Sequence, residues 1–241
     1  MARMTSPTGV RDELLQAAVG LLNEHGPDAL QTRKVAGAAG TSTMAVYTHF
    51  GGMRGLIAAV AEEGLRQFDA ALTLPSTADP VGDLLAVGIA YRRYAIERPH
   101  MYRLMFGSTS AHGINAPAHN VLTLTIAQIE QQHPSFAHVV RAVRRSMLAG
   151  RLAAAGSADD DATVVAVAAQ FWALVHGFVM LELAGFYGDD DDTAVEPVLA
   201  SMTANLLVAL GDSAEQVKRS QRSAVVAGGT RKPRGSRAAT T

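Results

Sequence analysis

The chain of 241 residues is long enough for one or two domains, and its 48% hydrophobic and 18% charged content is that of a soluble globular protein. It contains no cysteine, which excludes disulfides, thiolate catalysis and cysteine-ligated zinc. The formal net charge is −1, but a basic tail follows an acidic body, and such a tail either touches a polyanion or is a solvated disordered end.

The sequence opens without the apolar stretch of a secretory signal, and no uninterrupted apolar run reaches about 18 residues. We therefore expect a cytoplasmic protein with no membrane partner. The apolar periodicity is helical nearly everywhere, and no segment alternates convincingly like a strand. The predicted fold class is all-α.

Three short helices are predicted near the N-terminus. The first ends at Gly26–Pro27, and the second is capped by Thr32 and runs to about residue 39. The third is capped by Ser42 and ends near His49. Two helices joined by so short a turn describe a helix-turn-helix.

A longer fourth helix is predicted from about Met53 to about residue 72. We assign residues 1–54 to a helix-turn-helix DNA-binding domain, which this fourth helix links to the body. Residues 55–211 are predicted to form a helical ligand-binding and dimerisation domain. Residues 212–241 are rich in Gly, Ser and Arg and are predicted to be a disordered basic tail.

Two helices of the body are apolar on more than one side. They cover residues 158–185, where Ser157 and Asp160 resemble a capping box, and a last helix from about Val195 to Leu206. A helix that is hydrophobic around most of its circumference must be buried on most of it. Burial inside one domain is possible, and so is burial against a second copy as half of a four-helix bundle. We expect a homodimer formed through these two helices.

The run TSTMAVYTHF at residues 41–50 suits the third helix of a helix-turn-helix, which enters the DNA major groove. Hydroxyls at a helix start meet phosphates or bases, and Met44 offers apolar contact to a thymine methyl. The other interpretation is a short helix with ordinary solvated side chains. The candidate DNA-binding residues are Thr32, Arg33, Thr41, Ser42, Thr43, Met44, Tyr47, His49 and Arg54.

The run from residue 10 to residue 60 closely resembles, without a gap, the DNA-binding domain of the TetR family of transcriptional regulators. The resemblance rests on LLQAAVGLLNEHG, TRKVAGAAG and VYTHF. It implies a dimer whose hold on an operator changes when a small ligand binds the C-terminal domain, and family habit favours a repressor. Family members commonly carry a phosphate-binding lysine at the start of the fourth helix. This sequence has Met53 there, and Arg54 is the candidate substitute.

A second resemblance lies in the body. YRRYAIERPHMYRLMFG and FWALVHGFVMLELAG look like the TetR subgroup whose C-terminal domain is named for a Trp-His-Gly motif, here Trp172, His176 and Gly177. Trp172 and His176 share one helix face, and Gly177 permits close helix packing. His176 is a buried group bonded to a neighbour, a ligand contact, or a metal or catalytic group. No second histidine or carboxylate at helical spacing supports the last of these.

An effector pocket is expected between the helices of the body, where aromatic and methionine side chains would suit a largely apolar ligand. The alternative is that these side chains are simply core. The candidate effector-binding residues are Tyr91, Tyr94, Met105, Phe106, Trp172, His176 and Met180.

The sequence thus predicts a ligand-responsive regulator whose partners are double-stranded operator DNA, a small apolar effector and a second copy of the chain. No catalytic residue, metal ligand or cofactor is predicted. The acidic run Asp189–Asp192 suits a divalent cation, but acids before a helix need no metal. One rival is an architectural, sequence-tolerant DNA-binding protein that uses the basic tail. The other is an enzyme built on His176 and the acidic run, for which no nucleophile–base pair is present.

Overall fold

The computed structural model describes residues 7–107, 120–153, 156–188 and 193–227, and these contain helices and no strand. The predicted all-α class is confirmed. The elements in chain order are α1 (Pro7–His25), η1 (Pro27–Ala29), α2 (Thr32–Ala38), α3 (Thr43–Phe50), α4 (Met53–Leu72), α5 (Pro80–Glu97), α6 (Pro99–Phe106), η3 (Val121–Thr123), α7 (Ile126–Gln132), α8 (Pro134–Leu148), α9 (Asp161–Leu183), η4 (Val195–Ala200, π-helical), α10 (Ser201–Ala209) and α11 (Ala214–Ala227).

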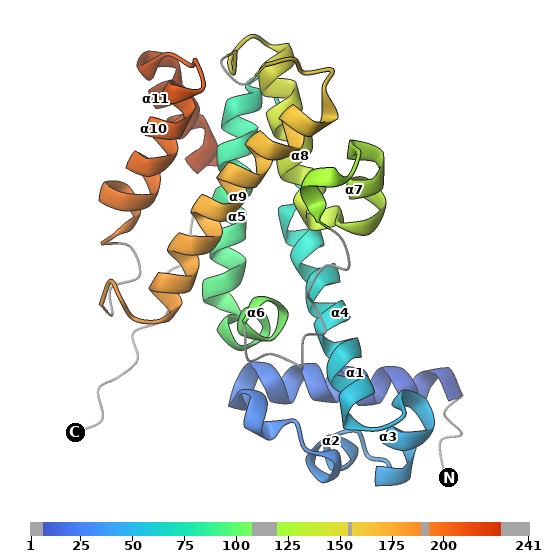
Figure 1. Ribbon diagram of the computed structural model, residues 1–241. Coiled ribbons are helices and arrows are strands. Elements are labelled where there is room, and N and C mark those ends of the chain that lie inside the picture. The colour runs from blue at the N-terminus through green and yellow to red at the C-terminus, as the bar shows by residue number, and fades with distance from the viewer. Residues whose placement is uncertain (1–6, 108–119, 154–155, 189–192, 228–241) are drawn as a thin grey trace, which may run out of the picture.

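The head of the molecule consists of α1, α2, α3 and the start of α4, and α4 rises from it into the body (Figure 1). Its small core contains Leu14 and Leu22 of α1, Val35 of α2 and Val46 of α3, all fully buried. These residues fall at helical spacing in the sequence, so burying them fixes which face of each helix turns inward. The opposite faces of α2 and α3 are left to solvent.

Residues 39–42 join α2 to α3, as the sequence predicts. Gly40 has a φ of 65°, and the amides of Gly40 and Thr41 donate to the carbonyls of Gly37 and Ala36, which together close α2 in a Schellman motif. The predicted cap at Thr32 is wrong. Thr32 is the first residue of α2, and Gln31, in an extended conformation, is the N-cap without a side-chain bond.

Helix α6 joins the head to the body, because it packs against both α1 and α4. The sulfurs of Met101 and Met105 lie so close to Gly64 of α4 that a Cβ there would stand 2.5 and 2.9 Å from them. The Tyr94 hydroxyl donates to the Gly64 carbonyl at 3.0 Å. Towards the head, the ring of His100 lies against Gly26 at the end of α1. Movement of α6 must therefore move α1 and α4.

Helix α9 crosses the body next to α5 and α8 (Figure 1). By length and composition it is apolar enough to cross a membrane, but its inward side is buried in this core. The predicted capping box at Ser157 is wrong, because Asp160 is the N-cap and accepts from the Ala162 amide, while the Ser157 hydroxyl accepts from the Asp159 amide.

The prediction of disorder from residue 212 onward is wrong for residues 214–227, which form helix α11 and pack along α5. Its anchor is Arg151, which donates to both carboxylate oxygens of the buried Asp212 at 2.8 and 2.6 Å, and also to Asp79 and Ser220 at 3.2 Å. This anchor joins segments distant in the sequence, so no local pattern announces it. Residues 228–241, the rest of the predicted tail, lie outside the described residues.

The substitution Asp212→Ala is expected to lower the free energy of unfolding by about 3 kcal/mol, because it leaves the largely buried Arg151 without its main partner. The side chain of Asp212 is 0% exposed and that of Arg151 is 17% exposed. Urea unfolding measures the effect. The control is Glu130→Ala, which removes an ion pair to Arg141 whose side chains are 44% and 50% exposed and should change stability by less than about 1 kcal/mol. Equal losses in both variants would contradict the anchoring role.

Candidate nucleic-acid interface and ligand cavity

The exposed side of α3 carries uncharged groups of several kinds. Met44 is 68% and Tyr47 is 57% exposed, and Ser42 and Thr43 are exposed at the start of the helix. Ser42 is the N-cap, but its side chain makes no capping hydrogen bond. The first amides of α3 and these hydroxyls therefore face solvent, where an anion or a base edge can meet them.

The remaining candidate DNA-binding residues surround this patch. Arg33 on α2 and Arg54 in the first turn of α4 are exposed, whereas Thr32, Thr41 and His49 are half-buried. All nine candidates lie on α2, the following turn, α3 or the first turn of α4. The structure therefore gathers them at one end of the head (Figure 1). Their contact with DNA stays a prediction.

Gly55, in the first turn of α4, was not among the residues predicted to shape this surface. A Cβ at Gly55 would stand 1.9 Å from the carbonyl oxygen of Phe50, so only glycine allows α4 to approach the end of α3 this closely. The Arg11 guanidinium of α1 lies over the Phe50 ring, at 5.0 Å from the ring centroid. The orientation of α3 is thus fixed from both α1 and α4. The last glycine of the run GGMRG was the pattern in the sequence that could have indicated this close approach.

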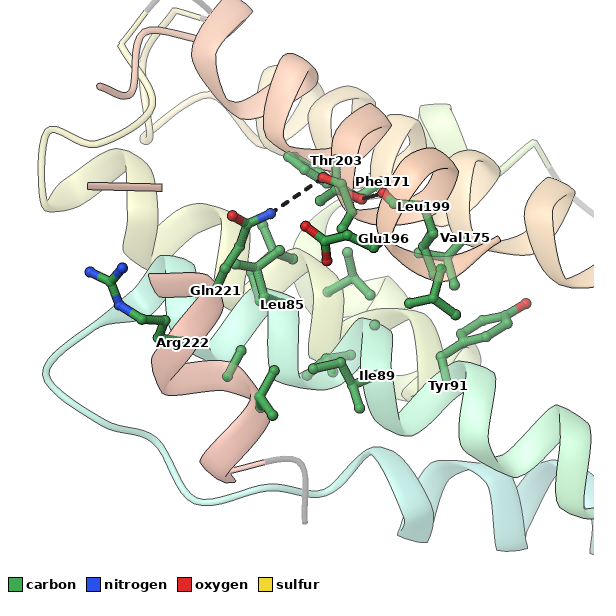
Figure 2. A pocket seen from close by; sticks show the side chains of 18 of the residues that line it. Leu85, Ile89, Tyr91, Phe171, Val175, Glu196, Leu199, Thr203, Gln221 and Arg222 are labelled. Carbon is green, nitrogen blue, oxygen red and sulfur yellow. Dashed lines mark hydrogen bonds between the residues drawn. The ribbon is translucent and has the colours of Figure 1, made fainter. Parts of the chain in front are cut away.

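A cavity of about 410 Å³ opens in the body between α5, α9, η4, α10 and α11 (Figure 2). Its volume lies in the range of small-molecule sites. Most of its lining is aliphatic or aromatic, and Leu85, Ile89, Phe171 and Val175 point into it. The polar side chains that line it come from η4, α10 and α11, and they are Glu196, Thr203, Lys218, Gln221 and Arg222.

Two of the seven candidate effector-binding residues, Tyr91 and Trp172, line this cavity. The other five lie outside its lining. They are Tyr94, Met105, Phe106, His176 and Met180. None of the lining residues from η4 and α11 was predicted from the sequence. The helical spacing of the apolar residues Val217, Ala224 and Val225 was the pattern that could have indicated α11.

His176 belongs to a polar group inside an aromatic cluster. Its Nδ1 lies 3.0 Å from the Tyr91 hydroxyl and 2.8 Å from the Tyr102 hydroxyl, and the two hydroxyls are 2.8 Å apart. Burial lowers the pKa of His176, and burial is also the main reason why the pKa of Tyr91 and of Tyr102 is raised. The neutral imidazole therefore accepts at Nδ1, and the two tyrosines stay protonated. Of the three interpretations of His176, these bonds agree with the first, a buried group bonded to its neighbours.

Gly177 does not pack closely inside the chain. A Cβ there would meet nothing within 4 Å, since the residue lies on the exposed side of α9. Among the described residues, no three histidine, aspartate or glutamate side chains gather closely enough to hold a metal ion. The acidic run Asp189–Asp192 lies outside those residues.

Two family models match the chain. Residues 14–60 match the bacterial regulatory proteins of the tetR family, and residues 84–206 match the tetracyclin repressor-like C-terminal domain. No curated protein sequence gives a significant match.

Solved structures share the fold over most of their length. A protein of unknown function from Rhodococcus sp. RHA1 aligns with a TM-score of 0.62 at 26% identity, over 87% of this chain and 98% of that one. RolR in complex with the ligand resorcinol aligns with a TM-score of 0.58 at 17% identity, over 89% and 94%. RolR without ligand gives 0.58 at 16%, over 88% and 96%. At these identities the RolR structures share the fold alone.

The lowered pKa of His176 predicts a pH dependence of stability. Folding favours the neutral imidazole, so this contribution is present above the ordinary pKa of 6.5 and is lost as the pH falls below it. His176→Gln keeps an acceptor for the tyrosines but does not titrate. Between about pH 7.5 and pH 5.5, the urea midpoint should fall less in this variant than in the wild type. A wild-type slope in His176→Gln would refute the assignment.

Proposed function

Because the chain belongs to the TetR family of bacterial regulatory proteins, we propose that it is a ligand-responsive transcriptional repressor which binds a palindromic operator as a homodimer. The observation that carries the proposal is the exposed side of α3, the second helix of a helix-turn-helix, which has hydroxyl, thioether and phenol groups. A regulator of this kind acts in the cytoplasm, where the DNA is.

In this proposal α3 enters the major groove of the operator. Met44 and Tyr47 are the exposed large side chains of α3, so they and Thr43 are the groups that reach base edges or the adjoining phosphates. Arg33 and Arg54 flank the helix from α2 and α4 and neutralise phosphates. Arg54 takes the part of the lysine that family members commonly carry at the start of the fourth helix.

The dimer forms through the exposed faces of α9 and α10, the two helices for which a homodimer is expected. The exposed side of α9 carries Ala166, Ala173, Gly177 and Leu181, spaced along one helix face and without charge. Met202 and Val208 are the exposed apolar residues of α10. Small residues let two helix backbones approach closely, so Gly177 has its use between chains instead of within one.

The effector is a small, largely apolar molecule that occupies the cavity next to α5, α9 and α11. Tyr91 and Trp172 line the cavity, and the Tyr91 hydroxyl is hydrogen-bonded to that of Tyr102 of α6. Because α6 packs on both α1 and α4, a ligand that displaces Tyr91 shifts the head relative to the body. Half-sites recur about 34–36 Å apart, so a small change in head spacing loses one of them.

The course of α11 weighs against the architectural rival. Lys218, Arg219 and Arg222, the first bases of the tail, lie on α11 at the end of the molecule opposite α2 and α3 (Figure 1). They cannot reach DNA that is held by α3 of the same chain. The rival is left with the bases beyond residue 227.

The first experiment is a footprint of the purified protein on DNA tiled across the upstream region of its own gene, in moderate salt with excess nonspecific competitor. We expect one protected, roughly palindromic site. Thr43→Ala/Tyr47→Ala should weaken binding to it by at least about tenfold, because each lost contact is worth about 1–3 kcal/mol. Gln131→Ala, exposed on α7 of the body, is the control.

Removing residues 228–241 distinguishes the two functions. The regulator keeps its protected site after this truncation. Binding spread evenly over all tiles and abolished by the truncation would establish the architectural protein instead.

The dimer is tested with Ala173→Glu, which places a charge in the middle of the uncharged face of α9. Light scattering after gel filtration should fall from twice the mass of the chain to the mass of one chain, since a buried unpaired charge opposes association. Ala127→Glu makes the same change at an exposed position of α7 and should remain dimeric. A wild-type monomer, or an unchanged dimer in Ala173→Glu, would disprove this interface.

A further inference from the structure

The cavity has two unlike sides. The walls from α5, α8 and α9 offer Leu84, Leu85, Ile89, Val139 and Val175, none of which can form a side-chain hydrogen bond. The side made by η4, α10 and α11 offers Glu196 and Gln221, which Figure 2 shows, and Lys218. A ligand that is polar throughout, such as a sugar or a nucleotide, would lose its water contacts against the apolar walls without replacement. The geometry therefore suits an amphiphile.

A second, smaller cavity continues from the polar side. It measures about 210 Å³, lies between α10 and α11, and shares Glu196, Ala200, Lys218 and Gln221 with the first. These shared residues form the boundary between the two cavities. A polar head group placed at this boundary leaves its apolar tail in the larger cavity and keeps contact with the more polar one.

The charges on the polar side of the larger cavity favour an anion, because two bases and one acid line it. Lys218 and Arg222 are four residues apart on α11, and Glu196 is the single acid among the lining residues. Within the described part of the chain, neither base forms an ion pair. Lys218 lines both cavities, whereas Arg222 lines the larger one alone, so Lys218 is the partner for a head group at their boundary. Glu196 then accepts a hydrogen bond from a protonated or hydroxylated group of the ligand.

We propose that the effector of this protein is an amphiphilic carboxylate, whose apolar tail lies along α5 and α9 and whose carboxylate is bound by Lys218. The proposal rests on the function proposed above and adds the chemical class of the ligand. Its recognition element, α11, begins after residue 206, where the match to the family domain ends. The Arg151–Asp212 anchor holds this helix, and hence Lys218, in place.

The chain contains a single tryptophan, Trp172, and it lines the cavity. Its fluorescence therefore reports occupancy in the full-length protein without any label. Decanoate, 1-decanol and decylamine are titrated below their micelle concentrations, at a pH where decanoate is ionised. We expect decanoate to bind at least about tenfold more tightly than the other two, as a charge-assisted hydrogen bond allows.

Lys218→Met should weaken decanoate binding by about tenfold and leave the affinity for decanol unchanged. The control is Arg219→Met, which removes the same charge from the neighbouring position of α11. Arg219 does not line either cavity, so its loss should leave decanoate binding unchanged. Equal losses in the two variants would reduce the effect to general surface charge and overturn the proposal.

Other outcomes overturn it as well. Decylamine binding at least as tightly as decanoate would assign the head group to Glu196, and equal binding of all three would leave an apolar effector without a carboxylate. No fluorescence change with any of them would remove the ligand class altogether. The operator footprint is independent of these titrations. Decanoate binding without an operator would thus refute the proposed function alone, and an operator without decanoate binding would refute this inference alone.

Discussion

The contacts of the Phe68 ring hold the two halves of the molecule together. Phe68 lies on α4, the helix that begins in the head and ends in the body, and it is fully buried. Its ring makes edge or tilted contacts, at centroid distances of 4.9 to 6.1 Å, with Tyr91 and Tyr94 of α5, Phe106 of α6 and Trp172 of α9. Because one side chain touches three helices of the body, α4 cannot tilt without disturbing all of them. The direction in which α4 leaves the body, and with it the position of α3, depends on this cluster.

The same cluster borders the cavity, because Tyr91 and Trp172 contribute to both. A close-packed interior responds to a displaced ring by moving its neighbours, since it has few voids that could absorb the change. The most direct neighbour is Tyr102, which connects Tyr91 to α6 and so to the contacts at Gly64 and Gly26. This contiguity gives a ligand a physical means of acting on the head. It also explains why the aromatic side chains singled out in the sequence lie between the cavity and the head more often than inside the cavity.

The limits of prediction from the sequence follow from the range of the interactions. The turn at Gly40 and the inward position of Val46 are set by neighbours in the chain, so local signals located the head and the exposed side of α3. The composition of α11 suggested disorder, because what orders it is the pairing of Arg151 with Asp212 across the body. That error also made the prediction of the cavity lining incomplete. With the tail assumed to be disordered, neither Lys218 nor Gln221 was available as a lining residue, and only the aromatic wall was foreseen.

Core packing and the lining of the cavity place different constraints on the helices of the body. The faces of α5 and α9 that bury Tyr91, Trp172 and their neighbours must keep their packing, because a changed volume there costs stability and moves α4. Lys218 and Arg222, two of the residues of α11 that line the cavity, carry no such load, since both are exposed and the helix is anchored from its start by Asp212. We expect substitutions at these positions to change what the cavity binds without disturbing the core. In the proposed function, ligand specificity therefore resides where the packing constraint is weakest, while the means of transmitting the signal resides where it is strongest.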